Sequence, residues 1–182
     1  MSIINIKDNL IEGVTFHSSP NFDSRPKDTD ISLIVIHSIS LPPGKYGGNG
    51  IKDFFLNELD TSNHEYFESI KNLKVSSHIL IKRTGETLQF VPFNKRAWHA
   101  GISSYLGKEN CNDYSIGIEL EGTDDSEFTD EQYNSLKNLT SSLIRSYPNL
   151  SEDRLVGHSD IAPGRKLDPG IFFDWKRFIV DV

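Results

Sequence analysis

The sequence predicts an α/β (α+β) fold in which a central mixed β-sheet is flanked by helices within a single domain. The run Ile31–Ile36 is apolar on both pleat faces, which is typical of a strand inside a covered sheet. Ser115–Glu121 alternates between large apolar residues and glycine or glutamate, as a second strand would. A long amphipathic pattern from Thr129 indicates a helix whose apolar stripe needs a sheet to cover. The 182 residues suit one domain, which we expect to span residues 1–182.

The middle of the chain is expected to supply a helix and a hairpin. Apolar residues at helical spacing behind Asn49, a suitable N-cap, predict a short helix over Gly50–Leu59 that packs on the sheet. Ser76–Lys82 and Glu86–Pro92 are predicted as strands joined by a tight turn, in which Gly85 supplies the positive φ that the turn needs.

The second half of the chain carries the clearest patterns. Glu119 and Glu121 fall on the same face of their strand because side chains alternate along it. The helix from Thr129 has Gln132 as its capping-box partner and is expected to stop before Pro148. No repeat, linker or low-complexity tract divides the chain.

The composition argues against several classes of partner. Lys and Arg number 19 against 26 Asp and Glu, a net charge of -7, so neither nucleic acid nor an anionic membrane is an expected partner. The chain has no run of about 18 apolar residues and no apolar leader at its start. Its single cysteine, Cys111, cannot form a disulfide within the chain, which fits a reducing compartment. We therefore expect a cytoplasmic protein without an obligate protein partner.

Two of the six histidines stand where α/β folds place reactive groups. His37 and His158 each lie where an apolar run gives way to a loop, so we expect the two imidazoles to meet in space. His17 and His64 lie in polar, irregular stretches and are expected at the surface.

The turn-rich loop Gly157–Gly170 adds a carboxylate, Asp168, before a last amphipathic segment that starts at Asp174. Two neutral imidazoles and one carboxylate can hold Zn²⁺ and leave a fourth position for water. His37, His158 and Asp168 are therefore candidate zinc ligands. The loop's composition equally fits a stiff surface loop, and the three residues form no compact sequence motif.

Several segments together resemble a known enzyme family. They are Val35–Gly44, Val75–His78, Arg96–Gly101, Cys111–Asp113, Ile116–Gly122 and His158–Gly170. These segments resemble the AmpD amidases, cytosolic N-acetylmuramoyl-L-alanine amidases that recycle 1,6-anhydro-muropeptides and are related to phage lysozyme-type amidases and peptidoglycan-recognition proteins. The resemblance runs in order over about residues 16–178, which it marks as the amidase core, and it implies an N-acetylmuramoyl-L-alanine amidase-like fold.

The resemblance also implies roles for site residues. It makes His37, His158 and Asp168 the ligands of one Zn²⁺ per chain. Glu119 would take a proton from the attacking water and pass it to the departing amine. Lys166 would stabilise the tetrahedral oxyanion, although by itself it reads as a solvated surface lysine. The bond cleaved would join the lactyl group of N-acetylmuramic acid to the L-Ala of the stem peptide.

The residues near these candidates can each be assigned more than one role. Glu121 shares the strand face and competes for the role of the base. Trp98 either stacks on a sugar face or fills the core. His78 and His99 either line the cleft, as substrate or supporting groups, or serve packing, and we take His99 as a substrate-contact candidate. Cys111 is expected to be structural rather than a nucleophile.

The sequence departs from its relatives at three positions. Ser38 replaces an asparagine, and Lys74 and Asn110 stand where relatives carry arginines suited to the carboxylates of the peptide. We expect Lys74 and Asn110 to contact the substrate, although Lys74 lacks the bidentate fork of arginine and Asn110 lacks the charge. Lys45 and Lys108 are nearby cations that could compensate.

Three functions compete. The leading hypothesis is a zinc amidase acting on small anhydro-muropeptides. The second is an amidase of polymeric cell wall, a lysin, which the acidic net charge disfavours. The third is a non-catalytic muropeptide-binding module, which the complete set of candidate ligands disfavours.

Overall fold

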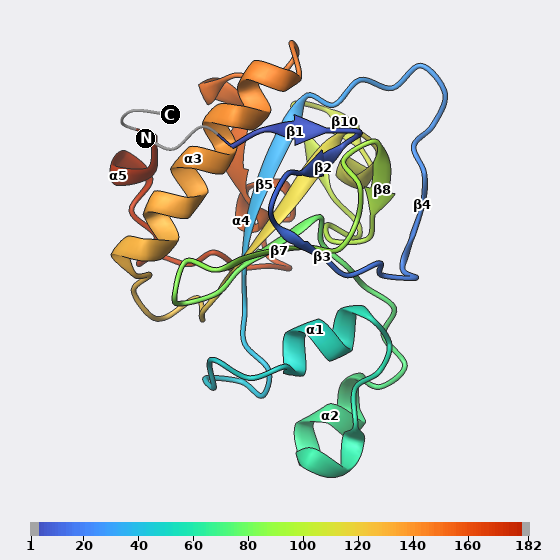
Figure 1. Cartoon of the computed structure of the whole chain (residues 1–182), viewed down its shortest axis with the longest axis vertical. Helices are drawn as coiled ribbons and strands as arrows, with labels where there is room; N and C mark the ends of the chain where they lie inside the picture. Colours follow the sequence, from blue (N-terminus) through green and yellow to red (C-terminus); the bar gives the residue numbers. More distant parts are fainter. Residues whose placement is uncertain (1–3, 180–182) are drawn as a thin grey trace.

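The computed structural model describes residues 4–179, and its centre is a six-stranded mixed β-sheet (Figure 1). The strands, in their order across the sheet, are β12 (Leu155–Gly157), β5 (Leu33–Ile39), β11 (Ser115–Glu121), β6 (Ile79–Ile81), β7 (Thr87–Gln89) and β3 (Thr15–Phe16). Neighbouring strands run parallel, except that β6 and β7 pair antiparallel. The predicted fold class is confirmed.

The remaining elements are helices and short two-stranded ladders. The α-helices are α1 (Gly50–Phe55), α2 (Glu65–Ile70), α3 (Asp130–Ser146), α4 (His158–Ile161) and α5 (Trp175–Ile179). The 3-10 helices are η1 (Thr61–Asn63), η2 (Cys111–Asp113) and η3 (Glu152–Arg154). The ladders pair β1 (Ile6–Lys7) with β2 (Leu10–Ile11), β4 (Phe22–Ser24) with β8 (Lys95–Ala97), and β9 (Ser104–Tyr105) with β10 (Lys108–Glu109). Between residues 4 and 179, no helix combines the length and apolar character needed to cross a bilayer.

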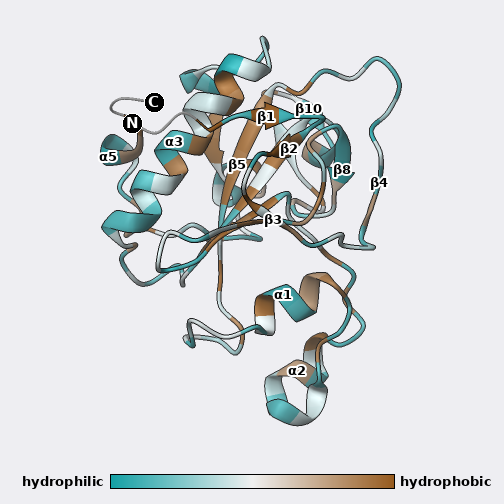
Figure 2. Cartoon of the chain, in the orientation of Figure 1, coloured by the Kyte–Doolittle hydropathy of each residue, from teal (hydrophilic) through white to brown (hydrophobic). Residues whose placement is uncertain are grey.

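One face of the sheet is covered by α3 and α5 (Figure 1). Ile116 and Ile118 of β11 pack in one cluster with Leu136 and Leu143 of α3 and Phe178 of α5, and all five are fully buried. The central strands are correspondingly hydrophobic in Figure 2. Each such side chain contributes about 1.5–3 kcal/mol by burial, so this layer is the main core, and the apolar stripe expected of the helix is confirmed.

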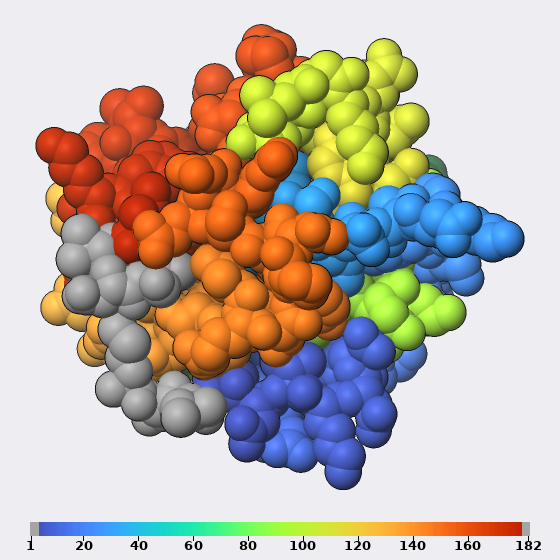
Figure 3. Space-filling view, turned by 90° about the horizontal axis from the view of Figure 1, so that it is seen from above, coloured from blue at the N-terminus to red at the C-terminus, as the bar shows by residue number. Residues whose placement is uncertain are grey.

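The ends of α3 follow the predicted local chemistry. Thr129 and Gln132 cap it reciprocally, each side chain accepting a hydrogen bond from the other's backbone N–H at 3.1 Å. The helix ends at Ser146, two residues before Pro148. Beside this end lies the N-terminal β1–β2 ladder, seen in Figure 3 as blue atoms against orange, and Tyr147 there donates its hydroxyl to Asn9 Oδ1 at 3.2 Å.

The opposite face carries α1 and α2 over the β6–β7 hairpin (Figure 1). Phe55 of α1 packs with Leu80 and Leu88 of the two strands, as expected of a helix lying on the sheet. The predicted extension of this helix to Leu59 is wrong. It ends at Phe55 because the chain turns out of the helix at Asn57, which takes a left-handed φ of 61°.

Three strands differ in length from the prediction. β5 continues past Ile36 because its parallel ladder with β11 persists as far as the pair Ile39 and Glu121. His37 therefore projects from within a strand rather than from its end. The hairpin is confirmed, with Gly85 at a φ of 80°, but its paired segments are shorter than predicted.

Candidate active site

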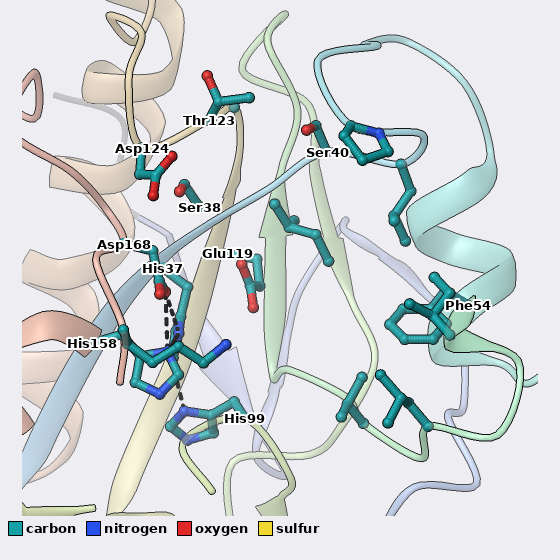
Figure 4. A pocket seen from close by; sticks show the side chains of 18 of the residues that line it. His37, Ser38, Ser40, Phe54, His99, Glu119, Thr123, Asp124, His158 and Asp168 are labelled. Carbon is teal, nitrogen blue, oxygen red and sulfur yellow. Dashed lines mark hydrogen bonds and ion pairs between the residues drawn. The ribbon is translucent and has the colours of Figure 1, made fainter. Parts of the chain in front are cut away.

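A cleft of about 580 Å³ opens on the face of the sheet that carries α1 and α2 (Figure 4). It lies toward the carboxyl ends of β5 and β11, where α/β folds collect reactive groups. One side is formed by α1, α2 and the segment that follows them, and the other by the loop 165–168. Trp98 and His99, which follow β8, complete the wall.

His37, His158 and Asp168 meet in this cleft (Figure 4). His37 Nδ1 lies 2.9 Å from His158 Nδ1 and 3.1 Å from Asp168 Oδ2, and His158 Nδ1 lies 3.0 Å from the same oxygen. Both histidines are almost fully buried, with 1% and 2% of their surface exposed. The expectation that the imidazoles of His37 and His158 meet is confirmed.

The chemistry of this cluster fits a metal ion. His158 donates its Nε2–H to the carbonyl oxygen of Ala100 at 3.0 Å, so its Nδ1 presents a lone pair. Burial lowers the pKa of His37 to about 4, so that imidazole is neutral at pH 7. Lone pairs that converge within about 3 Å repel one another unless a cation lies between them. Two imidazole nitrogens and one carboxylate oxygen form a donor set that suits zinc with an open fourth position.

The loop that brings Asp168 to the histidines is held by local contacts. Ser159 donates its backbone N–H to the carbonyl oxygen of Asp168 at 2.9 Å. Asp160 accepts the backbone N–H of Gly157 at 2.7 Å. A Cβ on Gly157 would lie 2.8 Å from Cδ of Pro169, so glycine is needed for the loop to approach β12 this closely.

Glu119 projects into the cleft beside this cluster (Figure 4). It pairs in register with His37 on the neighbouring parallel strand, so the two side chains share a face. Only 9% of Glu119 is exposed, and its Oε2 has no hydrogen-bond partner among the described residues. Burial, reinforced by the charge of Asp168, raises the pKa of Glu119 well above its ordinary 4.5.

Glu121, the competing carboxylate, lies outside the cleft lining. Its two oxygens accept the backbone N–H groups of Gly47, at 2.7 Å, and Arg83, at 3.0 Å. This carboxylate therefore ties two loops to the end of β11, and Glu119 is the one with a free oxygen toward the cluster.

The loop 165–168 brings two cations to the cleft. Lys166, half-buried, lines it, as the family resemblance implies. Arg165 also lines it, and its Nη2 donates to the carbonyl oxygens of Ala100 and Ile102, each at 2.6 Å. Sequence reasoning missed Arg165, whose only signal was its place beside Lys166.

The predicted substrate-contact residues divide into two groups. Trp98 and His99 line the cleft, as does Ser38. Lys74 and Asn110 are exposed and do not belong to the lining. Asn110 instead takes a left-handed φ of 57° at the start of η2, and this conformation serves a turn.

The other histidines and the cysteine considered in the sequence analysis lie outside the cleft lining. His78 is fully buried, accepts the N–H of Gly117 at Nδ1, 3.0 Å away, and presents Nε2 to the carbonyl oxygen of Lys95. Cys111 is buried beside the hydroxyl of Tyr114, 3.2 Å from its Sγ, which agrees with a structural role. His17 and His64 are only partly exposed, and His64 caps α2 by accepting the N–H of the second helical residue.

The chain is similar to enzymes of known type. Residues 27–171 match the model of a family described as N-acetylmuramoyl-L-alanine amidase. The 1,6-anhydro-N-acetylmuramyl-L-alanine amidase AmpD of Haemophilus influenzae is 54% identical over 164 residues, which cover 90% of this chain and 89% of the relative. A crystal structure of a selenomethionine derivative of AmpD superposes with a TM-score of 0.95 at 50% identity, covering 98% of this chain and 99% of that one.

A more distant relative has been solved with a substrate. It is the amidase AmiD from Escherichia coli in complex with anhydro-N-acetylmuramic acid-L-Ala-D-gamma-Glu-L-Lys, with a TM-score of 0.61 and 29% identity, covering 86% of this chain and 60% of AmiD. The residues that match the family model include five of the six strands of the sheet and the residues that line the cleft. The chain belongs to the N-acetylmuramoyl-L-alanine amidase family, a family of amide hydrolases, and resembles its AmpD members most strongly among these relatives.

Proposed function

We propose that this chain is a zinc-dependent amidase that hydrolyses the amide between the lactyl group of 1,6-anhydro-N-acetylmuramic acid and the L-Ala of the stem peptide, in cytosolic peptidoglycan recycling. The observation that carries the proposal is the convergence of His37, His158 and Asp168 within 3.1 Å of one another, beside a buried carboxylate in an open cleft. The domain would span residues 1–182, with its core at about residues 16–178.

His37, His158 and Asp168 would hold the ion through Nδ1, Nδ1 and Oδ2. Zinc, when bound, polarises the amide carbonyl and makes a neighbouring water acidic enough to attack near pH 7. Glu119, whose Oε2 is unpartnered, would accept the proton of that water and return it to the departing amine. Burial raises the pKa of Glu119 in the metal-free chain, which favours the protonated form that the second step needs.

Lys166 would supply positive charge where the carbonyl oxygen becomes negative. Amides have poor leaving groups, so most of the barrier lies in forming and collapsing the tetrahedral species, and a preorganised cation lowers it. The residue before Lys166 is held in place, because Arg165 donates hydrogen bonds to the carbonyl oxygens of Ala100 and Ile102.

The substrate class follows from the cleft and the relatives. AmpD relatives are named for the 1,6-anhydro-muramyl bond, and the AmiD complex contains an anhydro-muramyl peptide. Trp98 offers an aromatic face for a sugar. Lys74 and Asn110 could reach a long stem peptide only beyond the cleft lining, so peptide carboxylates would first meet Arg165. The net charge of -7 favours a small soluble muropeptide over polymeric, anionic wall.

The test is product analysis. Mass spectrometry of a reaction with an anhydro-N-acetylmuramyl-tripeptide should detect the free tripeptide and the anhydro-sugar, with loss of both products on chelation and recovery on adding zinc. Full activity in metal-free protein would overturn the zinc proposal. Clearing of purified sacculi would instead indicate a wall-degrading amidase. Tight muropeptide binding at full zinc occupancy, without product over hours, would indicate a non-catalytic module.

A further inference from the structure

We propose that His99 is a positioning residue of the metal site rather than a substrate contact: it accepts a hydrogen bond from Nε2 of His37 and thereby keeps Nδ1 of His37 bare for the metal. The inference rests on the zinc site proposed above. It adds a residue whose imidazole would never touch the ion.

His99 lies between His37 and Ser115, and the direction of its two hydrogen bonds follows from the proposed metal site. Nε2 of His37 lies 2.9 Å from Nδ1 of His99, and Nε2 of His99 lies 3.1 Å from Oγ of Ser115. A neutral imidazole has one N–H and one acceptor nitrogen. If His37 is to offer Nδ1 to a metal, its proton must sit on Nε2, and His99 must then accept at Nδ1 and donate from Nε2 to the serine hydroxyl. Both ring nitrogens of His99 and Nε2 of His37 then have a matching partner.

The strand beneath the ring is shaped to receive it. Gly117 of β11 lies between Ser115 and Glu119 on the same face. A Cβ on Gly117 would lie 2.7 Å from Nδ1 of His99 and closer still to its Cγ, so any larger residue here would clash with the ring. The missing side chain at this position therefore gives the His99 ring its seat against the sheet, with both nitrogens in line with their partners.

One short segment serves both histidine ligands. Asn112 Oδ1 accepts the backbone N–H groups of His99, at 3.2 Å, and Ala100, at 2.8 Å, and so fixes the segment. The ring of His99 then meets Nε2 of His37, while the carbonyl oxygen of Ala100 accepts Nε2–H of His158 at 3.0 Å. Each ligand thus has its second nitrogen engaged by consecutive residues, the arrangement by which proteins fix the tautomer and orientation of metal-binding histidines.

These contacts also revise the expected role of His99. Both of its ring nitrogens are engaged by protein groups, so neither is free for a substrate hydrogen bond. The ring is edge-on to His37, with centroids 5.0 Å apart and planes at 83°. The ring of His99 therefore serves to orient the ring of His37.

The test is zinc affinity, measured by competition with a chromogenic chelator on the full chain. His99→Phe keeps a ring of similar size without an acceptor, and should weaken zinc binding about 10-fold to 100-fold, the usual cost of losing such a partner. His99→Asn places an amide oxygen near the position of Nδ1 and should recover much of the affinity. His17→Phe is the matched control, because His17 neither lines the cleft nor contacts the proposed ligands, and the zinc affinity of this variant should equal that of the unaltered chain.

The outcomes separate the inference from the proposed function. Equal zinc affinity of His99→Phe and the unaltered chain would overturn the inference alone, as would an equal loss in His99→Asn and His99→Phe. Absence of zinc binding by the unaltered chain would overturn the proposed function and the inference together. Thermal unfolding of each metal-free variant reports whether it folds, and if His99→Phe does not, the smaller His99→Leu answers the same question.

Discussion

Replacing Glu119 with glutamine keeps the shape of the side chain and removes its ability to accept a proton. The carboxylate is 9% exposed, and its Oε2 has no partner among the described residues, so little else depends on it. A positioned general base and acid contributes about 10²–10⁴-fold to a rate, and we expect kcat to fall by that factor. The proposed ligands His37, His158 and Asp168 are unchanged, so zinc affinity should stay within about threefold of wild type, which is less than 1 kcal/mol.

The same substitution should stabilise the metal-free protein at neutral pH. Burial raises the pKa of Glu119 in the folded chain, so the folded state favours the protonated form and loses stability as the pH rises above the ordinary value of 4.5. Glutamine removes that loss. A buried charge without a partner costs about 1 kcal/mol or more, so Tm should rise by roughly 2–4 °C or more at pH 8. Below pH 4.5 the difference should vanish, because both side chains are then neutral.

Two assays check this prediction: steady-state release of peptide from an anhydro-muropeptide by the zinc-loaded enzymes, and thermal unfolding of the metal-free proteins from pH 4 to pH 8. Turnover by Glu119→Gln at the wild-type rate would refute the role of this carboxylate and return attention to Glu121. A Tm difference of the opposite sign, or one independent of pH, would refute the reasoning about its burial.

Three further predictions concern other residues. Lys166→Ala should lower kcat by about 10²-fold or more at unchanged zinc affinity, because it removes charge stabilisation made mainly in the transition state; a purely raised KM would contradict this. Trp98→Ala should raise KM about tenfold if the ring stacks on a sugar, since such a contact contributes about 1–1.5 kcal/mol, and unchanged KM would assign the ring to packing. Thr129→Ala removes the cap of α3 and should lower stability by about 1 kcal/mol in urea unfolding, with kcat intact; no change would show that the capping contacts are dispensable.

Local chemistry made some elements predictable from the sequence. Ser115–Glu121 was predicted to the residue because its alternation agrees with the ladder on both sides. The cap at Thr129 uses only residues within one turn, so it too could be read directly. The helix Glu65–Ile70 was missed, because it is short and is capped by His64, a residue outside the usual N-cap set.

The site was predictable only in part. The residue types of the candidate ligands indicate zinc, but their convergence depends on a fold that joins segments 121 and 131 residues apart in sequence. The bond between His37 and His99 links residues 62 apart, and that of Arg165 to Ala100 links residues 65 apart. No sequence pattern encodes such contacts. The preference for Glu119 came from the family resemblance, and the tethering of Glu121 by two backbone amides now supplies a physical reason for it.

The most direct test of the central claim is a zinc titration of the metal-free chain, followed by the rate at which peptide is released from an anhydro-N-acetylmuramyl peptide. We expect no turnover without metal, a linear rise in rate with added zinc, and a plateau at one zinc per chain. Turnover before any zinc is added, or a rate that stays at zero once one equivalent has bound, would contradict the account.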